Sequence, residues 1–310
     1  MTSKLDQIRK INADDSNYPQ RMRELSGMPA SIYCLGELPD ENTPTIAMVG
    51  ARACTGYGQR IAREFGAAFA RCGIQVISGM AVGIDGYSQE GALAGGGKTF
   101  AVLGSGVDIC YPSGHTTLYH NIIKQGGVLS ELPPGTPPLR WNFPMRNRII
   151  SALSDLVLVI EARSKSGSLI TADFALEQGK TVFAVPGRVG DRLSDGCNYL
   201  IAQGAGIAWS ADAVIEELLA KGNVPSLSTI EKKREGAKRT LSRKILQDPL
   251  LSGEARDLFY KIPADDTVST DDLISATSLP VQKISSCLTE LICAGYVEEV
   301  TYGIYRKKIS

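Results

Sequence analysis

An aromatic residue stands beside arginines in the stretch FPMRNRIISALS, which contains Phe143, Arg146, Asn147 and Arg148. An exposed aromatic ring can stack on a nucleic-acid base, while guanidinium groups hold the phosphates of the backbone. The same residues also fit a buried phenylalanine with two arginines in structural ion pairs. For this stretch alone the second interpretation is favoured, and the other polar loops of the chain shift the balance toward nucleic acid.

A second candidate is the stretch VGARACTGYG, which follows an apolar run. Arg52 comes just after Gly50, where its forked guanidinium group can pair with a phosphate through two hydrogen bonds. Thr55, Tyr57 and Gly58 are expected to open the next helix. A nucleotide-site loop or a simple packed turn also fits this stretch, but the GxGxxG spacing is absent, which counts against a dinucleotide.

Two more glycine-rich loops are SGMAVGID and LGSGVDICYP. Their carboxylates, Asp85 and Asp108, can be read as the acid and base of an enzyme. Hydrogen bonds that fix the loops are the preferred interpretation. The small residues that suit an anion cradle lined by backbone groups are Ser78, Gly79, Gly83, Gly104 and Gly106.

The stretch IEARSKSGSLITADF places Glu161 at the expected end of a strand. Glu161 fits either a catalytic role or the orientation of an arginine. Hydroxyl residues and glycine then begin a helix, whose free N–H groups suit a phosphate, and a lysine adds charge. These residues are Lys165, Ser166, Gly167, Ser168 and Thr171.

A parallel sheet is expected to position these loops, because most apolar runs are rich in valine and isoleucine and lack polar alternation. Helical patterns such as QRIAREFGAAFARCG, LITADFALEQG and ADAVIEELLAKG lie between the runs, and each ends at a glycine. This alternation predicts an α/β fold with a Rossmann-like, doubly wound, mostly parallel sheet, whose ligands bind at the carboxyl ends of the strands. The expected strands are 46–49, 75–78, 99–103, 127–130, 156–161, 181–185 and 207–209.

The expected organisation has four parts: an N-terminal cap segment (1–45), the Rossmann-like domain (46–220), a basic linker (221–245) and a winged-helix domain (246–310). The last part contains three helical patterns, GEARDLFYKI, TDDLISATS and VQKISSCLTELICAG, followed by a hairpin pattern, YVEEVTYGIYRKK. Its recognition helix would begin near Pro280 and carries only Lys283 as a base, with Glu290 opposing it. Protein contact is therefore favoured over DNA contact for this domain.

The composition and net charge of the chain do not exclude a nucleic-acid ligand, but they argue against a membrane-spanning, secreted or metal-binding protein. The chain has 33 basic and 33 acidic residues, but the location of the charges decides whether DNA binds. No apolar run approaches the roughly 20 residues that span a membrane, and no secretory leader is recognisable. Scattered cysteines without a CxxC pair indicate a cytoplasmic protein, and with two histidines no metal or cofactor is expected.

Together these motifs resemble the DNA-processing protein A family, DprA, also called Smf. The resemblance runs from about Asn17 to Leu218 and includes the motifs GSGVDICYP, LSELPPG and GCNYLIAQGA. It implies a non-catalytic, homodimeric protein that binds single-stranded DNA and helps load RecA recombinase during natural transformation. The binding role carries over to Arg52, Phe143, Arg146 and Arg148, and more loosely to Lys165 and the glycine loops.

The sequence departs from the family pattern in three respects. Gln89 stands where the family usually has histidine, and His115 where it usually has asparagine. Both changes affect a local hydrogen bond rather than the charges of the site. Family members often begin with an extra helical domain, for which the N-terminal segment is too short.

Two other hypotheses remain open. A nucleotide phosphoribohydrolase would use a similar scaffold but carries a PGG-x-GT motif, where this chain has PGR at 186–188 and SGSLIT. An interaction hub would use the dimer and the acidic winged helix to recruit a recombinase, and it is compatible with DNA binding.

Overall fold

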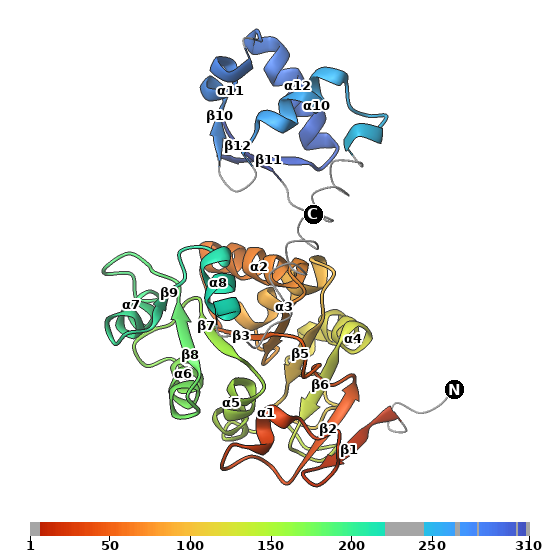
Figure 1. The fold of residues 1–310 in the computed structure, drawn as a ribbon, viewed down its shortest axis with the longest axis vertical. Helices are drawn as coiled ribbons and strands as arrows, with labels where there is room; N and C mark the ends of the chain where they lie inside the picture. The colour runs from red at the N-terminus through yellow and green to blue at the C-terminus, as the bar shows by residue number, and fades with distance from the viewer. Residues whose placement is uncertain (1–6, 221–244, 264–266, 278, 302, 308–310) are drawn as a thin grey trace. The chain divides into compact units, whose positions relative to one another are not determined.

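The computed structural model describes residues 7–220, 245–263, 267–277, 279–301 and 303–307. It divides into two compact units, Met1–Lys233 and Arg234–Ser310 (Figure 1). The expected basic linker lies outside the described residues, apart from Ile245. The four-part division of the chain therefore stays a prediction.

A nine-stranded sheet forms the centre of the first unit, in the order β1-β2-β6-β5-β4-β3-β7-β8-β9. The seven strands from β6 to β9 in this order are parallel, which confirms the predicted Rossmann-like sheet. The strand order reverses between β3 and β7, so the topological switch point lies there. The parallel strands are β3 (Thr45–Val49), β4 (Gln75–Ser78), β5 (Thr99–Val102), β6 (Gly127–Ser130), β7 (Leu156–Val159), β8 (Thr181–Ala184) and β9 (Gly206–Ile207).

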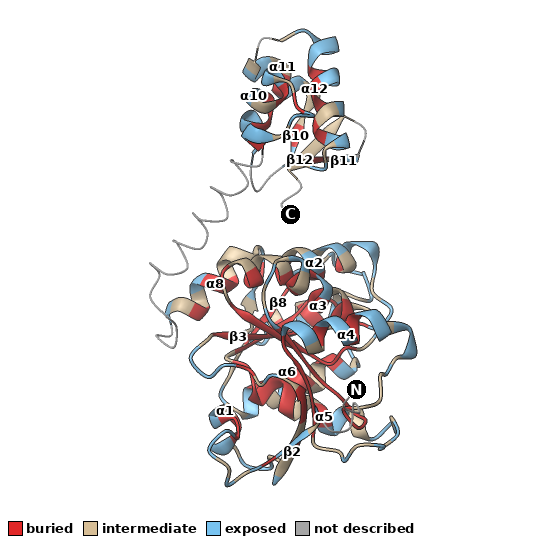
Figure 2. Ribbon diagram, turned by 90° about the vertical axis from the view of Figure 1, so that its right-hand side faces the viewer, coloured by how far each residue is buried: buried red, intermediate tan, exposed pale blue. Residues whose placement is uncertain are grey.

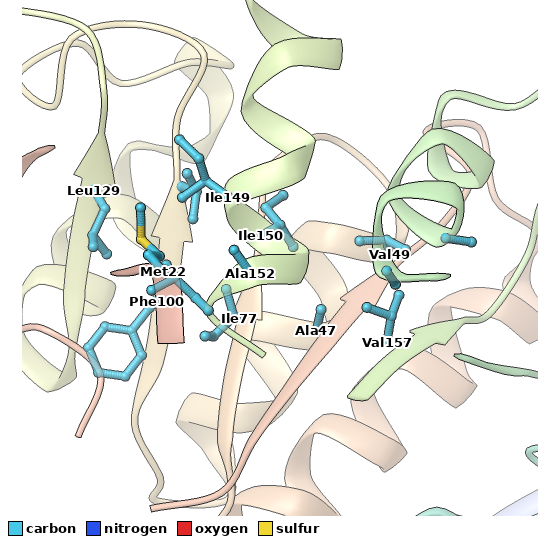
Figure 3. Close-up of a cluster of buried hydrophobic side chains, with 14 of the residues drawn as sticks. Met22, Ala47, Val49, Ile77, Phe100, Leu129, Ile149, Ile150, Ala152 and Val157 are labelled. Carbon is cyan, nitrogen blue, oxygen red and sulfur yellow. The ribbon is translucent and has the colours of Figure 1, made fainter. Parts of the chain in front are cut away.

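Helices cover both faces of this sheet, which is why its central strands are buried throughout (Figure 2). Side chains alternate between the faces along each strand. Ala47 and Val49 pack with Ile149 and Ile150 on one side (Figure 3), whereas Met48 packs on the other. One face carries α2 (Gly56–Arg71), α3 (Ile84–Ala94), α4 (Thr116–Gln125) and α8 (Ala211–Ala220), and the other α5 (Asn142–Ala152), α6 (Gly167–Glu177) and α7 (Asp195–Ala202).

Two of the three predicted helix ends at glycine are found in the structure. Gly73 follows α2 and Gly179 follows α6, both with the positive φ that favours glycine after a helix. The third predicted end, after α8, lies outside the described residues. A short 3₁₀ helix, Ser113–His115, precedes α4.

The N-terminal segment extends the sheet instead of lying on it as a separate cap. β1 (Arg9–Asn12) and β2 (Ser31–Gly36) are antiparallel strands, and β2 pairs with β6. The short helix α1 (Gln20–Arg23) lies between them and buries Met22 in the core. Arg21 of α1 bonds through Nε and Nη2 to the carboxylate of Asp155, at 3.2 Å each, and this carboxylate also accepts the N–H of Thr45. The segment is thus tied to the start of β3.

The second unit has a core of its own, which includes Leu258, Leu273 and Leu288. Three helices and a hairpin follow one another in the predicted order, so the expected elements are present. The winged-helix assignment itself stays a prediction. The elements are α10 (Gly253–Lys261), β10 (Val268–Ser269), α11 (Thr270–Thr277), α12 (Val281–Cys293), β11 (Val297–Thr301) and β12 (Ile304–Lys307).

The substitution Asp155→Asn is expected to lower the free energy of unfolding by about 1–3 kcal/mol, because Arg21 and Thr45 lose a charged acceptor at a nearly buried position. Urea-induced unfolding of the full chain, followed by circular dichroism, measures this change. Glu41→Gln is the matched control, since Glu41 meets the same arginine at 3.4 Å but its side chain is 39% exposed. A comparable loss for both variants would contradict the anchoring role of Asp155.

Candidate nucleic-acid interface

An open cleft of about 840 Å³ lies at the topological switch point of the sheet. The loops after β3, β4 and β7 line it, together with the first turns of α5 and α6. Ligands of open α/β sheets bind at this position, beyond the carboxyl ends of the strands. The predicted site residues that line the cleft are Gly50, Arg52, Phe143, Arg146, Asn147, Lys165, Ser166, Gly167, Ser168 and Thr171.

Phe143 presents a half-buried aromatic ring to the cleft from the first turn of α5. The ring centroid lies 5.3 Å from Cζ of Arg52 and 5.5 Å from the ring of Tyr111. The ring also packs on Gly104, where an added Cβ would lie 2.9 Å from Cδ1 of the ring. The ring is therefore held in place from several sides while part of it stays accessible.

Arg146 lies in the floor of the cleft and is only 4% exposed. Its Nη1 donates to the carbonyl of Gly79 at 2.9 Å and to that of Val102, and its Nε donates to Oδ1 of Asn147. Burial lowers the pKa of Arg146 to about 10, so it remains charged at neutral pH. The sequence suggested a phosphate clamp, whereas the structure shows a buried charge that joins α5 to the ends of β4 and β5.

The buried arginine has an acidic neighbour in Asp85, which also lines the cleft. Burial raises the pKa of Asp85, and the charge of Arg146 opposes that rise. The carboxylate accepts the N–H of Gly79 at 3.1 Å. Asp108 likewise accepts the N–H of Gly135. Both carboxylates therefore fix loops, as the preferred interpretation expected.

Four exposed cations surround the opening of the cleft: Arg52, Arg140, Arg163 and Lys165. Within the described residues none of the four has an acidic partner in an ion pair. Unpaired charges at a concave surface create a positive potential that attracts an anion. The sequence analysis missed Arg140 and Arg163. Their only sequence signal is proximity to the FPMRNR and SGSLIT motifs, in PPLRWNF and EARSK.

The N-terminus of α6 forms one wall of the cleft. Ser166 caps this helix by accepting the N–H of Ser168, and Asn147 of α5 donates to the carbonyl of Gly167. The positive end of a helix dipole favours an anion at such a place, and Lys165 adds a full charge beside it.

Glu161 holds the loop that carries Arg52. Its carboxylate accepts the N–H of Thr55 at 2.9 Å and the Thr55 hydroxyl at 2.5 Å. Its carbonyl accepts the N–H of Ala51 at 2.7 Å. Gly58 lies against the same carboxylate, which leaves no space there for a side chain. The carboxylate thus binds Thr55 rather than the arginine that the sequence analysis considered.

Other predicted residues lie beneath or beside the cleft instead of lining it. Ser78 donates its hydroxyl to the carbonyl of Met48, and Gly79 packs against the guanidinium of Arg146. Tyr57 is exposed at the start of α2. The remaining residues that do not line the cleft are Thr55, Gly58, Gly83, Gly104 and Gly106.

Arg148 points to a different partner, although it is only two residues from Arg146. Its Nη2 lies 2.6 Å from Oε2 of Glu131 in an ion pair. Residues two apart in a helix face nearly opposite directions, so α5 cannot present both arginines to one ligand. A direct DNA contact by Arg148, as by the other residues outside the cleft, stays a prediction without support from this geometry.

The two departures from the family pattern have local consequences. Gln89 is buried and donates to the carbonyl of Phe100 at 3.0 Å, while its Oε1 has no partner within the described residues. His115 places Nδ1 3.1 Å from the carbonyl of Met80. Neither side chain lines the cleft.

Comparison with known proteins agrees with this fold. The family model for DNA recombination-mediator protein A matches residues 9–219. The chain is 36% identical to Protein Smf of Escherichia coli (strain K12) over 303 residues, which cover 96% of this chain and 76% of that protein. It is 41% identical to DNA processing protein DprA of Streptococcus pneumoniae over 203 residues, covering 66% and 72%. The chain belongs to the DNA recombination-mediator protein A family, which confirms the resemblance.

Solved structures of the same family are similar to this chain over about two thirds of its length. DNA processing protein A from Streptococcus pneumoniae matches with a TM-score of 0.66 and 39% identity over 69% of this chain and 75% of that one. DNA processing protein A from Helicobacter pylori, whose structure is described for a single-stranded DNA binding mode, matches with a TM-score of 0.63 and 30% identity over 69% and 97%.

The described part of the chain has the features of neither a metal site nor a membrane span. No group of three or more histidine, cysteine or acidic side chains comes together there in a way that could hold a metal ion. None of the described helices has the length and apolar character needed to span a bilayer.

Thr55→Val and Glu161→Gln are each expected to lower the free energy of unfolding by about 1–2 kcal/mol, because each removes a bond at the start of α2. The double variant is expected to lose less than the sum, with a coupling of about 1 kcal/mol, since both single variants disturb the same bond between the Thr55 hydroxyl and the Glu161 carboxylate. Urea unfolding of all four proteins measures the cycle. Strictly additive losses would contradict the role given to this bond.

Proposed function

We propose that this protein binds single-stranded DNA in the cleft at the switch point and does not act as an enzyme. The proposal is carried by one observation: four exposed cations, none of them ion-paired among the described residues, line the same cleft as the half-buried ring of Phe143. Phosphates would bind to Arg52, Arg140, Arg163 and Lys165, while a base stacks on Phe143. The described DNA-binding mode of the Helicobacter pylori relative supports the same ligand.

The geometry favours single strands over a duplex. The ring of Phe143 lies inside a cleft, so a base can stack on it only after it has left the stack of neighbouring bases. For a paired base, this unstacking and unpairing costs free energy. No pattern of donors and acceptors suited to one base is needed, because every base has a flat face that can stack. The proposed binding is therefore tolerant of sequence and sensitive to salt.

A phosphoribohydrolase-like enzyme is the alternative, and two contacts argue against it. Both carboxylate oxygens of Glu161 are engaged by Thr55, and Asp85 is buried and bonded to a backbone N–H. These bonds give both carboxylates a structural role, which counts against their use as a general base on a ligand in the cleft. Product formation in a nucleotide-turnover assay, abolished in Glu161→Gln, would favour the enzyme instead.

We further propose that the protein is a homodimer and helps load RecA recombinase during natural transformation. The family description and the names of the relatives support a role in DNA processing and recombination. The second unit fits protein contact better than DNA contact, because Lys283, the only basic residue of α12, already pairs with Glu254 at 2.5 Å.

Arg52→Glu is expected to weaken binding of a fluorescent oligo-dT at least tenfold and to reduce the salt dependence, with the slope of log K against log salt falling by about 0.7 for each lost phosphate contact. Phe143→Ala is expected to lose about 1–3 kcal/mol of binding free energy, or about 5- to 150-fold, with an unchanged slope, because stacking releases no counterions. Fluorescence anisotropy at several salt concentrations measures both.

Arg63→Glu is the matched control for this experiment. Arg63 is exposed on α2 but pairs with Glu90, and it does not line the cleft. Its charge reversal should leave the affinity nearly unchanged. Full affinity in Arg52→Glu would overturn the proposed site.

Deletion of residues 245–310 is expected to abolish co-purification of RecA with the tagged protein while leaving oligo-dT affinity intact, because the cleft belongs wholly to the first unit. Pull-down and anisotropy on the same preparations test both statements. Unchanged capture of RecA by the shortened chain would contradict the role given to the second unit.

A further inference from the structure

A second cationic feature lies outside the cleft, in the loop between β8 and α7 (residues 186–194, here called the 186–194 loop). Arg188 and Arg192 are both exposed, and neither has an acidic partner within the described residues. Between them lies Val189, which is 98% exposed. All three side chains are exposed, and among the described residues the two arginines have no acidic partner, so these side chains are available to a ligand.

The backbone of the same loop is held firmly. The side-chain amide of Asn198 binds both backbone groups of Gly187, accepting its N–H at 3.2 Å and donating to its carbonyl at 3.0 Å. Gly187 lies so close to Ser194 that no Cβ fits. Ser194 in turn donates its N–H to the carbonyl of Asp191 at 2.8 Å. A loop fixed in this way presents its arginines without an entropy cost for ordering its backbone on binding.

The loop is also joined directly to the wall of the cleft. The N–H of Ala162 donates to the carbonyl of Leu193 at 2.8 Å, and the N–H of Gly196 donates to the carbonyl of Ala162 at 2.9 Å. Leu193 and Arg163, on either side of this junction, both line the cleft. Arg192 directly precedes Leu193, so the loop that carries the two arginines starts from the edge of the cleft at which Arg163 lies.

We propose that a DNA strand bound in the cleft leaves it across the 186–194 loop, where Arg188 and Arg192 bind two backbone phosphates and Val189 packs against a sugar or base. This inference rests on the proposed function and adds the direction in which the strand extends. A strand that leaves the cleft on the side of Arg163 meets these arginines next. Each nucleotide carries one phosphate, so successive phosphates along the strand can bind separate guanidinium groups.

An acidic protein surface is the competing partner for two free arginines. The hydrogen-bonded junction with the cleft favours DNA, because it fixes the loop against the place where the strand would emerge. Asp191 is the only acidic residue in the 186–194 loop, so the loop keeps a positive balance.

The test compares two lengths of oligo-dT, about 5 and about 16 nucleotides, near the two ends of the range that one single-strand-binding domain covers. The double variant Arg188→Ala/Arg192→Ala should bind the short oligonucleotide like the unaltered chain. It should bind the long one at least tenfold more weakly, with the salt slope reduced by about 1.4, or about 0.7 for each of two phosphates. Arg63→Ala/Lys98→Ala is the control, since it removes two exposed cations that already have acidic partners.

Three results decide between the possibilities. A loss for the long strand alone supports the proposed path. Equal affinity of the double variant and the unaltered chain for the long strand overturns it, and leaves the loop to a protein partner. Equal losses for both lengths also overturn it, because the arginines would then belong to the cleft. If Arg52→Glu binds both lengths normally, the proposed function itself fails, whatever the loop does.

Discussion

The proposed binding site depends on one buried cation, Arg146, and on the carbonyl groups that accept its hydrogen bonds. Moving a guanidinium out of water costs several kcal/mol, so its hydrogen bonds to Gly79 and Val102 and the nearby charge of Asp85 are what keep it in place. These bonds dock α5 on the ends of β4 and β5. Because Phe143 lies three residues earlier, on the same side of the helix, docking Arg146 also places the aromatic ring over Gly104. The stacking surface and the positive floor of the cleft are thus set by one contact.

A second constraint comes from the order of the strands. β3 lies between β4 and β7, and the chain leaves β3 and β7 in opposite directions across the sheet, which opens space between the loops that follow. Glu161 follows β7 and Thr55 follows β3, so the two bonds between them join the loops on either side of this space. The N–H of Ala51 also binds the carbonyl of Glu161. The loop that carries the exposed Arg52 is therefore anchored on both sides of this arginine.

Prediction from the sequence succeeded where the signal is local and failed where it depends on distant contacts. The strands 75–78 and 127–130 coincide with β4 and β6, because a strand buried on both faces is an uninterrupted apolar run. The segment SIYCLG was expected in a cap. No pattern within it indicates that it pairs with residues near Leu129, almost a hundred positions away in the sequence. Arg146 and Arg148 look equivalent in the sequence, and only the turn of the helix sends one to the cleft and the other to Glu131.

The same contrast explains how a chain of zero net charge presents a cationic surface. Arg21, Arg63, Lys98 and Arg148 have acidic partners, so they add little to the field outside the molecule. The cations around the cleft and in the 186–194 loop lack such partners within the described residues, and their charge is left for a ligand. Arg146 adds less to this field, because it is buried and the acidic side chain of Asp85 lies near it. The cations outside the floor of the cleft are exposed, so salt screens them most, and their contacts with a bound strand should weaken first as salt rises.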